Sequence, residues 1–139
     1  YFDEAGGMLS NSLLQDNRHG VYLGGCAAPV VQGNDINRNM FGVYETESEA
    51  CPSGPQAQIF ENNLQDNISS SVVLTQSSSG SHVRRMPSNW WGSVDVAVIG
   101  SQIYDHTDFN SSPYLDFSGF LDGPFPDGVA YSVNRRELL

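Results

Sequence analysis

A spaced pattern of apolar and polar residues recurs along the chain, and it constrains the fold more than any other feature of the sequence. The pattern reads apolar, two residues, polar, one residue, apolar, two residues, Asn. Its copies are Leu9, Ser12, Leu14, Asn17; Val31, Asn34, Ile36, Asn39; Ile59, Asn62, Leu64, Asn67; and, in part, Met86, Asn89, Trp91. Val31 follows Leu9 by 22 residues, and the same offset relates every other position of the first two copies.

An offset of this size matches one turn of a parallel β-solenoid, in which short strands alternate with bends. Apolar residues at equivalent positions then stack into an inward-facing column, and neighbouring turns stabilise one another. The recurrent Asn suits a bend, because Asn tolerates left-handed backbone angles, and stacked Asn side chains can bond to one another in a ladder. A leucine-rich repeat would need a denser Leu series, and an antiparallel sandwich would not need this register. We therefore expect an all-β parallel β-helix of about three to four coils.

Two insertions and two cysteines extend this scheme. Residues 45–55 are expected to form an acidic loop, and residues 76–81 a flexible loop that faces solvent. Cys51 lies in the first of these loops, and Cys26 lies at the corresponding corner of the preceding coil. Corners of adjacent coils lie above one another, so we expect a disulfide, worth about 3 kcal/mol for a loop of this length, and hence an oxidising compartment. Two unrelated thiols are the alternative.

Composition and charge exclude several classes of function. The chain has 16 acidic residues against 6 basic residues, which gives a formal net charge of −10. Nucleic acids and anionic membrane surfaces attract clustered cations, so neither is an expected partner. No apolar run is long enough to span a bilayer, and no signal peptide opens the chain. Because the first residue is Tyr1, we expect the chain to be processed or cut from a longer one.

The C-terminal third carries a resemblance to a known family. The residues concerned are Asn89-Trp90-Trp91-Gly92-Ser93, Val98-Ile99, Gln102-Ile103-Tyr104-Asp105, Asp108-Phe109 and Leu115-Asp116-Phe117. They resemble the end of right-handed parallel β-helix repeat proteins (pectate-lyase-like solenoids), in which Asn-Trp-Trp-Gly closes the last coil and a short helix follows. Residues 33–36 and 39–44 resemble repeats of the same family, whereas Pro113 precedes Leu115 and so departs from its pattern.

The resemblance implies a right-handed β-helix over residues 1–92 and a C-terminal capping segment and tail over 93–139. Trp90 and Trp91 would belong to this cap, with a sugar-stacking role for one of them as the alternative. Apolar residues between 94 and 104 have roughly helical spacing, so an amphipathic helix is expected to cover the open end. The family contains polysaccharide lyases, epimerases, adhesins, virus tail proteins and non-enzymatic modules, so the resemblance is specific for fold and not for function.

Candidate catalytic residues follow from the lyases of this family, which need a base and a group that neutralises uronate. Arg18, His19 and Arg38 lie near equivalent corners of adjacent coils and are the candidates. Asp16 lies 22 residues before Arg38, so a surface ion pair, worth well under about 1 kcal/mol, is the alternative explanation. The family's epimerase signature, the nucleophile elbow and the phosphate-cradling motifs are missing.

Candidate metal and glycan sites are few. Asp105 and Asp108 are the nearest approach to a local carboxylate cluster, and Ca²⁺ is the ion such oxygens would suit. No other cofactor is expected. Asn67 and Asn110 each begin a glycosylation sequon. Asn67 belongs to the predicted ladder and should be inaccessible, so Asn110 is the glycosylation candidate.

These observations favour an extracellular structural, adhesive or binding module, secreted or on the cell surface, that has no catalysis of its own. A carbohydrate-active enzyme, such as a polysaccharide lyase or epimerase, or a fragment of one, is the alternative, although an acidic chain is poorly suited to bind polyanions. Solenoids need caps at both ends, and residues 1–7 are too short to cover a coil. We therefore expect other protein subunits, or preceding parts of a longer chain, to cover the N-terminal coil, and polysaccharide is a further candidate partner.

Overall fold

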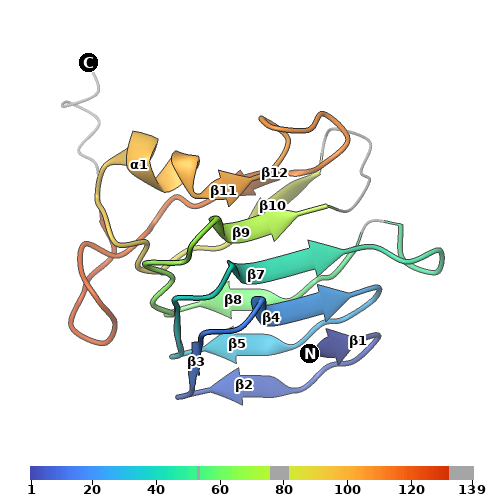
Figure 1. Cartoon of the computed structure of the whole chain (residues 1–139), viewed down its shortest axis with the longest axis horizontal. Coiled ribbons are helices and arrows are strands. Elements are labelled where there is room, and N and C mark those ends of the chain that lie inside the picture. The colour runs from blue at the N-terminus through green and yellow to red at the C-terminus, as the bar shows by residue number, and fades with distance from the viewer. Residues whose placement is uncertain (53, 76–81, 132–139) are drawn as a thin grey trace.

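The structure is a computed structural model that describes residues 1–52, 54–75 and 82–131. Short strands form several small parallel sheets, and a short helix, α1 (Val96–Ser101), lies near the C-terminal end (Figure 1). The largest sheet has the order β1 (Phe2–Asp3), β4 (His19–Gly24), β7 (Phe41–Thr46), β9 (Ser70–Leu74), β11 (Ile103–Tyr104). The other sheets are β2 (Met8–Ser10), β5 (Val30–Gln32), β8 (Gln58–Phe60); β3 (Leu13–Gln15), β6 (Asp35–Asn37); and β10 (Val83–Arg85), β12 (Tyr114–Asp116).

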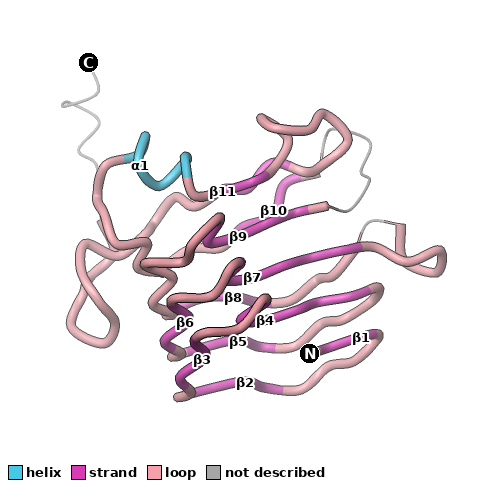
Figure 2. The backbone as a smooth tube through the Cα atoms, viewed as in Figure 1, coloured by secondary structure: helices cyan, strands magenta, loops and turns pink. Residues whose placement is uncertain are grey.

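Consecutive strands of the chain belong to different sheets. The chain forms β2, β3 and β4 in three sheets and then visits the same three sheets in the same order with β5, β6 and β7 (Figure 2). The pairing follows the sequence offset: Leu9 pairs with Val31, Leu14 with Ile36, and Val31 in turn with Ile59. Equivalent positions therefore lie above one another in successive layers.

The stacked apolar positions form a single core between the sheets. Its members are buried hydrophobic residues of every layer: Val21, Leu23, Val31, Ile36, Val43, Ala57, Ile59, Leu64, Val72, Leu74, Met86, Trp91, Ile99, Ile103, Leu115 and Phe120. Trp91 is fully buried, and its ring meets that of Phe117 at a centroid distance of 6.1 Å. Full burial of a Val, Leu, Ile, Phe or Met side chain contributes about 1.5–3 kcal/mol. Because core residues of adjacent layers bury one another, each layer depends on its neighbours for this contribution.

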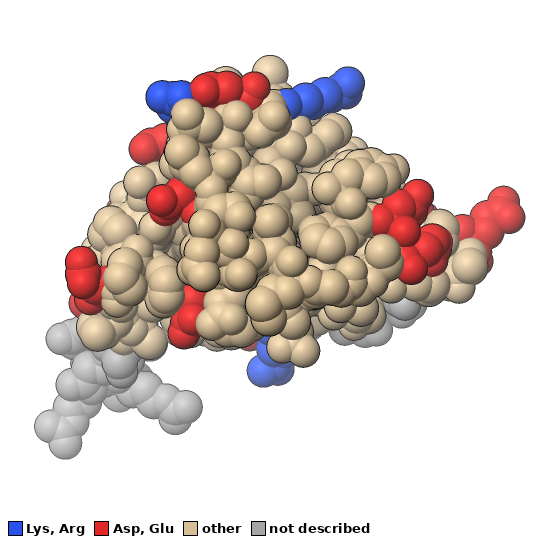
Figure 3. All heavy atoms as spheres, turned by 90° about the horizontal axis from the view of Figure 1, so that it is seen from below, with Lys and Arg blue, Asp and Glu red and all other residues tan. Residues whose placement is uncertain are grey.

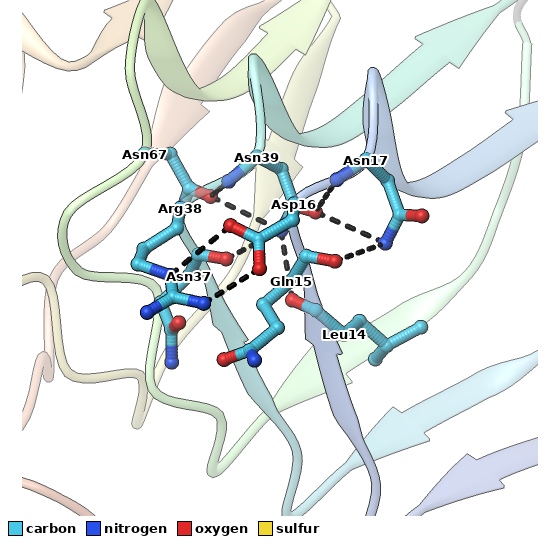
Figure 4. A network of polar contacts seen from close by, with 8 residues as sticks. All are labelled: Leu14, Gln15, Asp16, Asn17, Asn37, Arg38, Asn39 and Asn67. Carbon is cyan, nitrogen blue, oxygen red and sulfur yellow. Dashed lines mark hydrogen bonds and ion pairs between the residues drawn. The ribbon is translucent and has the colours of Figure 1, made fainter.

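Two columns of polar side chains, buried or half-buried except for the exposed Asn17, run beside this core. One contains Ser12, Asn34, Asn62 and Asn89, and the other contains Asn17, Asn39 and Asn67. The backbone N–H and the side-chain amide of Asn34 both donate to Asn62 Oδ1 at 3.0 Å. Asn39 repeats this arrangement on Asn67 Oδ1, at 3.1 and 3.3 Å (Figure 4). Because a buried amide is stable only when it is hydrogen-bonded, each ladder fixes the register between layers.

The ladders also explain the glycine that follows them in two layers. A Cβ atom on Gly42 would lie 2.8 Å from Asn67 Nδ2 and would collide with the Ser71 carbonyl oxygen. A Cβ atom on Gly20 would lie 2.7 Å from the Gly42 carbonyl oxygen and 2.8 Å from Asn39 Nδ2. These positions therefore need glycine for close packing between layers and not for an unusual backbone angle.

The segment after residue 92 differs from the expected amphipathic helix. Helix α1 spans only Val96–Ser101, and its single buried residue is Ile99, whereas Val98 is exposed. Ile103 and Tyr104, which were assigned to the helix, instead form β11 and pair with β9. The helical spacing was misleading because these two residues continue the largest sheet, where they pair with Val72 and Val73 of β9.

Residues 45–55 are likewise not all loop. Glu45 lies in β7 and is fully buried, and Arg84 of β10 reaches it across the interior. The guanidinium Nε and Nη2 donate to the two carboxylate oxygens at 2.9 and 2.5 Å, and Nη2 also donates to the Ala57 carbonyl oxygen. Burial lowers the pKa of Arg84, but the adjacent carboxylate of Glu45 outweighs burial and raises it. The pair is a bidentate ion pair between segments 39 residues apart.

Candidate interaction surface

The first strands of three sheets are edge strands that lie at one face of the molecule. Strands β1, β2 and β3 each pair with one neighbour, and their other edges face outward at the bottom of Figure 1. We call this face, with the side chains of Phe2, Met8, Leu9, Leu13 and Leu14, the first-layer end. Met8 is 65% exposed and Leu13 is 61% exposed, whereas the other three are partly buried against the core.

The charges around the first-layer end are peripheral. Viewed along the stack from this end, acidic and basic side chains lie around the outline and uncharged atoms fill the centre (Figure 3). Unpaired strand edges and exposed apolar side chains both favour contact with another polypeptide. The charged outline and uncharged centre have the composition of an interface with a polar rim.

One Asn ladder also stops at the first-layer end. Each internal ladder Asn uses its side-chain oxygen to accept from the residue of the preceding layer, as Asn39 Oδ1 accepts from the Asn17 backbone N–H at 3.0 Å and its side-chain amide at 3.2 Å. Asn17 Oδ1 has no such donor among the described residues, and the side chain is exposed (Figure 4). An added strand layer would therefore find a hydrogen-bond acceptor already in position.

Two of the three predicted catalytic residues, Arg18 and Arg38, line a shallow hollow beside this ladder. The hollow is lined by Asp16, Asn17, Arg18, Arg38, Met40, Phe41 and Ile68. Arg38 Nε and Nη2 donate to the Asp16 carboxylate at 3.1 and 2.6 Å, and both side chains are more than half exposed (Figure 4). This is the ion pair that the offset of 22 residues predicted, and an exposed pair of this kind contributes under about 1 kcal/mol. Arg18 reaches the same hollow, and the Arg38 guanidinium is held by a carboxylate.

His19 packs in a group of aromatic rings on the outer face of the largest sheet. Its ring centroid lies 4.8 Å from that of Tyr44 and 5.7 Å from that of Phe41, with which it stacks. Burial lowers the pKa of His19, and the positive charge of Arg18 lowers it further. The imidazole is thus held toward its neutral form, in contact with rings and outside the set of side chains that line the hollow. The structure brings Arg18 and Arg38 together and places His19 next to them.

Tyr22 and Tyr1 extend this aromatic group. Tyr22 stacks on Tyr44 with ring centroids 5.8 Å apart, and Tyr1 stacks on Tyr22 at 4.6 Å. Sequence reasoning missed the group, although the offset of 22 residues that relates Tyr22 to Tyr44 also relates His19 to Phe41, and β4 pairs with β7 in that register. Stacked in this way, the rings cover one another's faces, which leaves their edges to face outward.

The disulfide that the sequence predicted is present in the loops that follow β4 and β7. Cys26 and Cys51 are bonded, with their Cα atoms 5.3 Å apart. The Glu4 carboxylate lies against them and accepts from the Cys26 N–H at 3.0 Å and from the Ser48 hydroxyl at 2.8 Å. Glu4 and the two sulfurs form a group of metal-ligating atom types in the described part of the chain. Because both sulfurs belong to the disulfide, they lack the thiolate charge that a metal ion needs.

Asp105 and Asp108 serve the backbone of a turn. Asp105 is buried, and its carboxylate accepts from the Thr107 N–H, the Thr107 hydroxyl and the Leu115 N–H. Asp108 accepts from the Asp105 N–H at 3.1 Å. These carboxylate oxygens accept hydrogen bonds from protein donors, so the positions of Asp105 and Asp108 are explained by the turn without a metal ion. Asn110 is exposed, and a glycan on it stays a prediction.

Comparison of the chain with protein-family models, with curated proteins and with solved structures finds no match. The predicted loop of residues 76–81 lies outside the described residues. Within the described residues, no helix is long and apolar enough to cross a membrane. Functional conclusions therefore depend on the surfaces described above.

Proposed function

We propose that the chain is a right-handed parallel β-helix module that acts outside the cell as a structural or binding component, without catalysis of its own. The parallel pairing and the repeated order of sheets support a β-helix, as does the resemblance of residues 89–117 to the pectate-lyase-like repeat family. The disulfide supports an oxidising compartment, because cytosolic thiols are kept reduced.

The first-layer end is the observation that carries the proposal. Three strand edges, exposed apolar side chains and an unused ladder acceptor meet at one face. Each feature alone is common on protein surfaces, but together they match what an additional strand layer would need. We therefore propose that another polypeptide covers this end, and that the module contributes to a larger assembly.

Self-association of the isolated chain tests this proposal. Sedimentation velocity over a range of concentrations should show association of the wild-type chain, because its open edges have no other partner in the sample. Leu13→Lys should restore the monomer, since a charge placed among apolar contacts opposes docking. Val98→Lys is the matched control: Val98 is 44% exposed on α1, away from the first-layer end, and the variant should associate like wild type. A wild-type chain that stays monomeric at every concentration would refute the proposal.

A carbohydrate-active enzyme is the second candidate, and the hollow beside Arg18 and Arg38 is the observation that favours it. Two cations close to an apolar wall suit an acidic sugar. The Asp16 carboxylate on Arg38 and the aromatic packing of His19 weigh against it. Release of unsaturated oligosaccharides from an acidic polysaccharide by wild type, and its loss in Arg18→Ala, would establish this second candidate.

A further inference from the structure

The Tyr1–Tyr22 stack is a contact that neither the core nor the proposed interface explains. Tyr1 is 81% exposed, and Tyr22 lies half-buried on β4. Their ring centroids are 4.6 Å apart and the ring planes differ by 2°. The next ring of the column, Tyr44, lies 5.8 Å from Tyr22, with planes 7° apart. Two phenol rings this close and this parallel hold their ring carbons in van der Waals contact.

We infer that Tyr1 and Tyr22 form an oxidative modification site, at which a peroxidase supplied with peroxide couples the two rings into dityrosine. The stack lets a reaction that ordinarily requires collision of two radicals proceed within one molecule. Proximity of this kind raises the effective concentration of one reacting group at the other by many orders of magnitude. The exposed edge of Tyr1 gives a one-electron oxidant access to the pair.

The reaction balances without any group held by the protein. Each phenol loses one electron to the oxidised peroxidase and one proton to water, and each becomes a phenoxyl radical. The two radicals form one carbon–carbon bond between the ring positions next to the oxygens. The hydrogen on each newly bonded carbon then moves to the phenol oxygen, which restores both aromatic rings. The product has lost two hydrogen atoms in total, and the peroxide is reduced to water.

Of the other described tyrosines, Tyr44 also stacks on Tyr22, but at the longer centroid distance of 5.8 Å. Tyr114 packs against His106 and Tyr131 against Phe120, so a radical formed on either ring has no phenol in contact with it. Burial raises the pKa of Tyr22, and the neighbouring Tyr1 and Asp3 raise it further, so Tyr22 is a protonated phenol at neutral pH. The coupling would join Tyr1, the residue before β1, covalently to β4 and so fasten the first strand of the largest sheet.

Tryptic mapping tests the inference, because cleavage after Arg18 and Arg38 places Tyr1, Tyr22 and Tyr44 on three different peptides. The folded chain is treated with peroxidase and peroxide, monomer is isolated, the disulfide is reduced, and the digest is read by mass spectrometry. We expect peptide 1–18 joined to peptide 19–38, with a mass lower by two hydrogen atoms and with dityrosine fluorescence.

Two variants and a denatured sample complete the experiment. Tyr22→Phe should lose the joined peptide, whereas Tyr114→Phe should keep it at the wild-type yield. Circular dichroism of Tyr22→Phe checks that the fold is kept. The inference is overturned if oxidised monomer lacks the 1–18/19–38 product, if coupling joins 19–38 to 39–84 instead, or if the chain unfolded in urea gives the same yield.

Discussion

Substitution of Asn62 by Asp changes one atom at the centre of a ladder and so isolates the role of the side-chain amide. Asn62 is fully buried. Its Nδ2 donates to the Val31 and Phe60 carbonyl oxygens, both at 2.9 Å, and to Asn89 Oδ1 at 3.1 Å. In the Asn62→Asp variant an oxygen would face these three acceptors in place of the amide.

The cost can be worked from these contacts. An amide nitrogen has two hydrogens, so two good donor bonds are lost, and each buried acceptor left unsatisfied costs about 1–3 kcal/mol. The carboxyl group still accepts the two bonds from Asn34, which offsets part of this. We expect a loss of about 3–5 kcal/mol at pH 7, against a total stability of about 5–15 kcal/mol for an ordinary domain.

The loss should shrink in acid. Burial beside carbonyl oxygens raises the pKa of the new carboxyl group in the folded state above its unfolded value of about 3.9. A raised folded pKa means that the penalty grows as pH rises from the unfolded value through the folded value and is smallest below both. Protonation also restores one donor. The difference from wild type should therefore be smaller at pH 4 than at pH 7.

Urea denaturation followed by circular dichroism, with linear extrapolation to water, measures both quantities. Asn17→Asp is the matched control, because Asn17 lies at the exposed end of the other ladder, where water can replace a lost partner. Its cost should be about 1 kcal/mol or less. Equal losses in the two variants, or a loss in Asn62→Asp that is larger at pH 4 than at pH 7, would refute the reasoning.

Three further predictions concern other contacts. Arg84→Met should destabilise the fold by about 3–5 kcal/mol, because the buried Glu45 carboxylate would lose its guanidinium counter-charge and two charge-assisted hydrogen bonds; the double variant with Glu45→Gln should lose less than the two single variants combined, as a double-mutant cycle in urea will measure. Gly42→Ala should lower the melting temperature, because of the Cβ collision between layers, while Gly100→Ala on α1, where a Cβ atom meets nothing within 4 Å, should leave it equal or higher; calorimetry giving both the same shift would contradict this. Cys26→Ser should lose about 3 kcal/mol, since the disulfide closes a separation of 25 residues, and a urea midpoint equal to wild type would count against that contribution.

The sequence pattern located the first-layer end, but the structure decided which of its residues are exposed. Because residues 1–7 are too short to cover a coil, the sequence pattern predicts that Leu9, Leu14 and Val21 expose apolar edges. The structure leaves Leu9 and Leu14 partly buried and Val21 fully buried, with Met8 and Leu13 more exposed. The alternation of side chains along a strand explains the difference, because only one of two adjacent residues can face the core. The sequence pattern marks the inward residue, and its neighbour then carries the exposed surface.

The spacing of residues along the sequence was sufficient to predict a contact wherever that contact links equivalent positions of neighbouring layers. Leu14 over Ile36, Asp16 beside Arg38, and Cys26 near Cys51 are all separated by about one layer, and the sequence alone predicted each of them. A stacked fold repeats the same neighbour relation along its length, so one correct offset predicts many contacts.

Tertiary structure decided the contacts that do not repeat. The Glu45–Arg84 pair crosses the interior between segments 39 residues apart, and no second pair at this spacing marks it in the sequence. A second contact of this non-repeating kind is the hydrogen bond that the Phe125 N–H donates to Asn63 Oδ1, 62 residues earlier in the chain. Ile103 joined the sheet rather than the helix because an unpaired strand edge lay next to it. The sequence by itself therefore determined the stacked register, whereas the closing contacts depended on which surfaces the finished stack left unpaired.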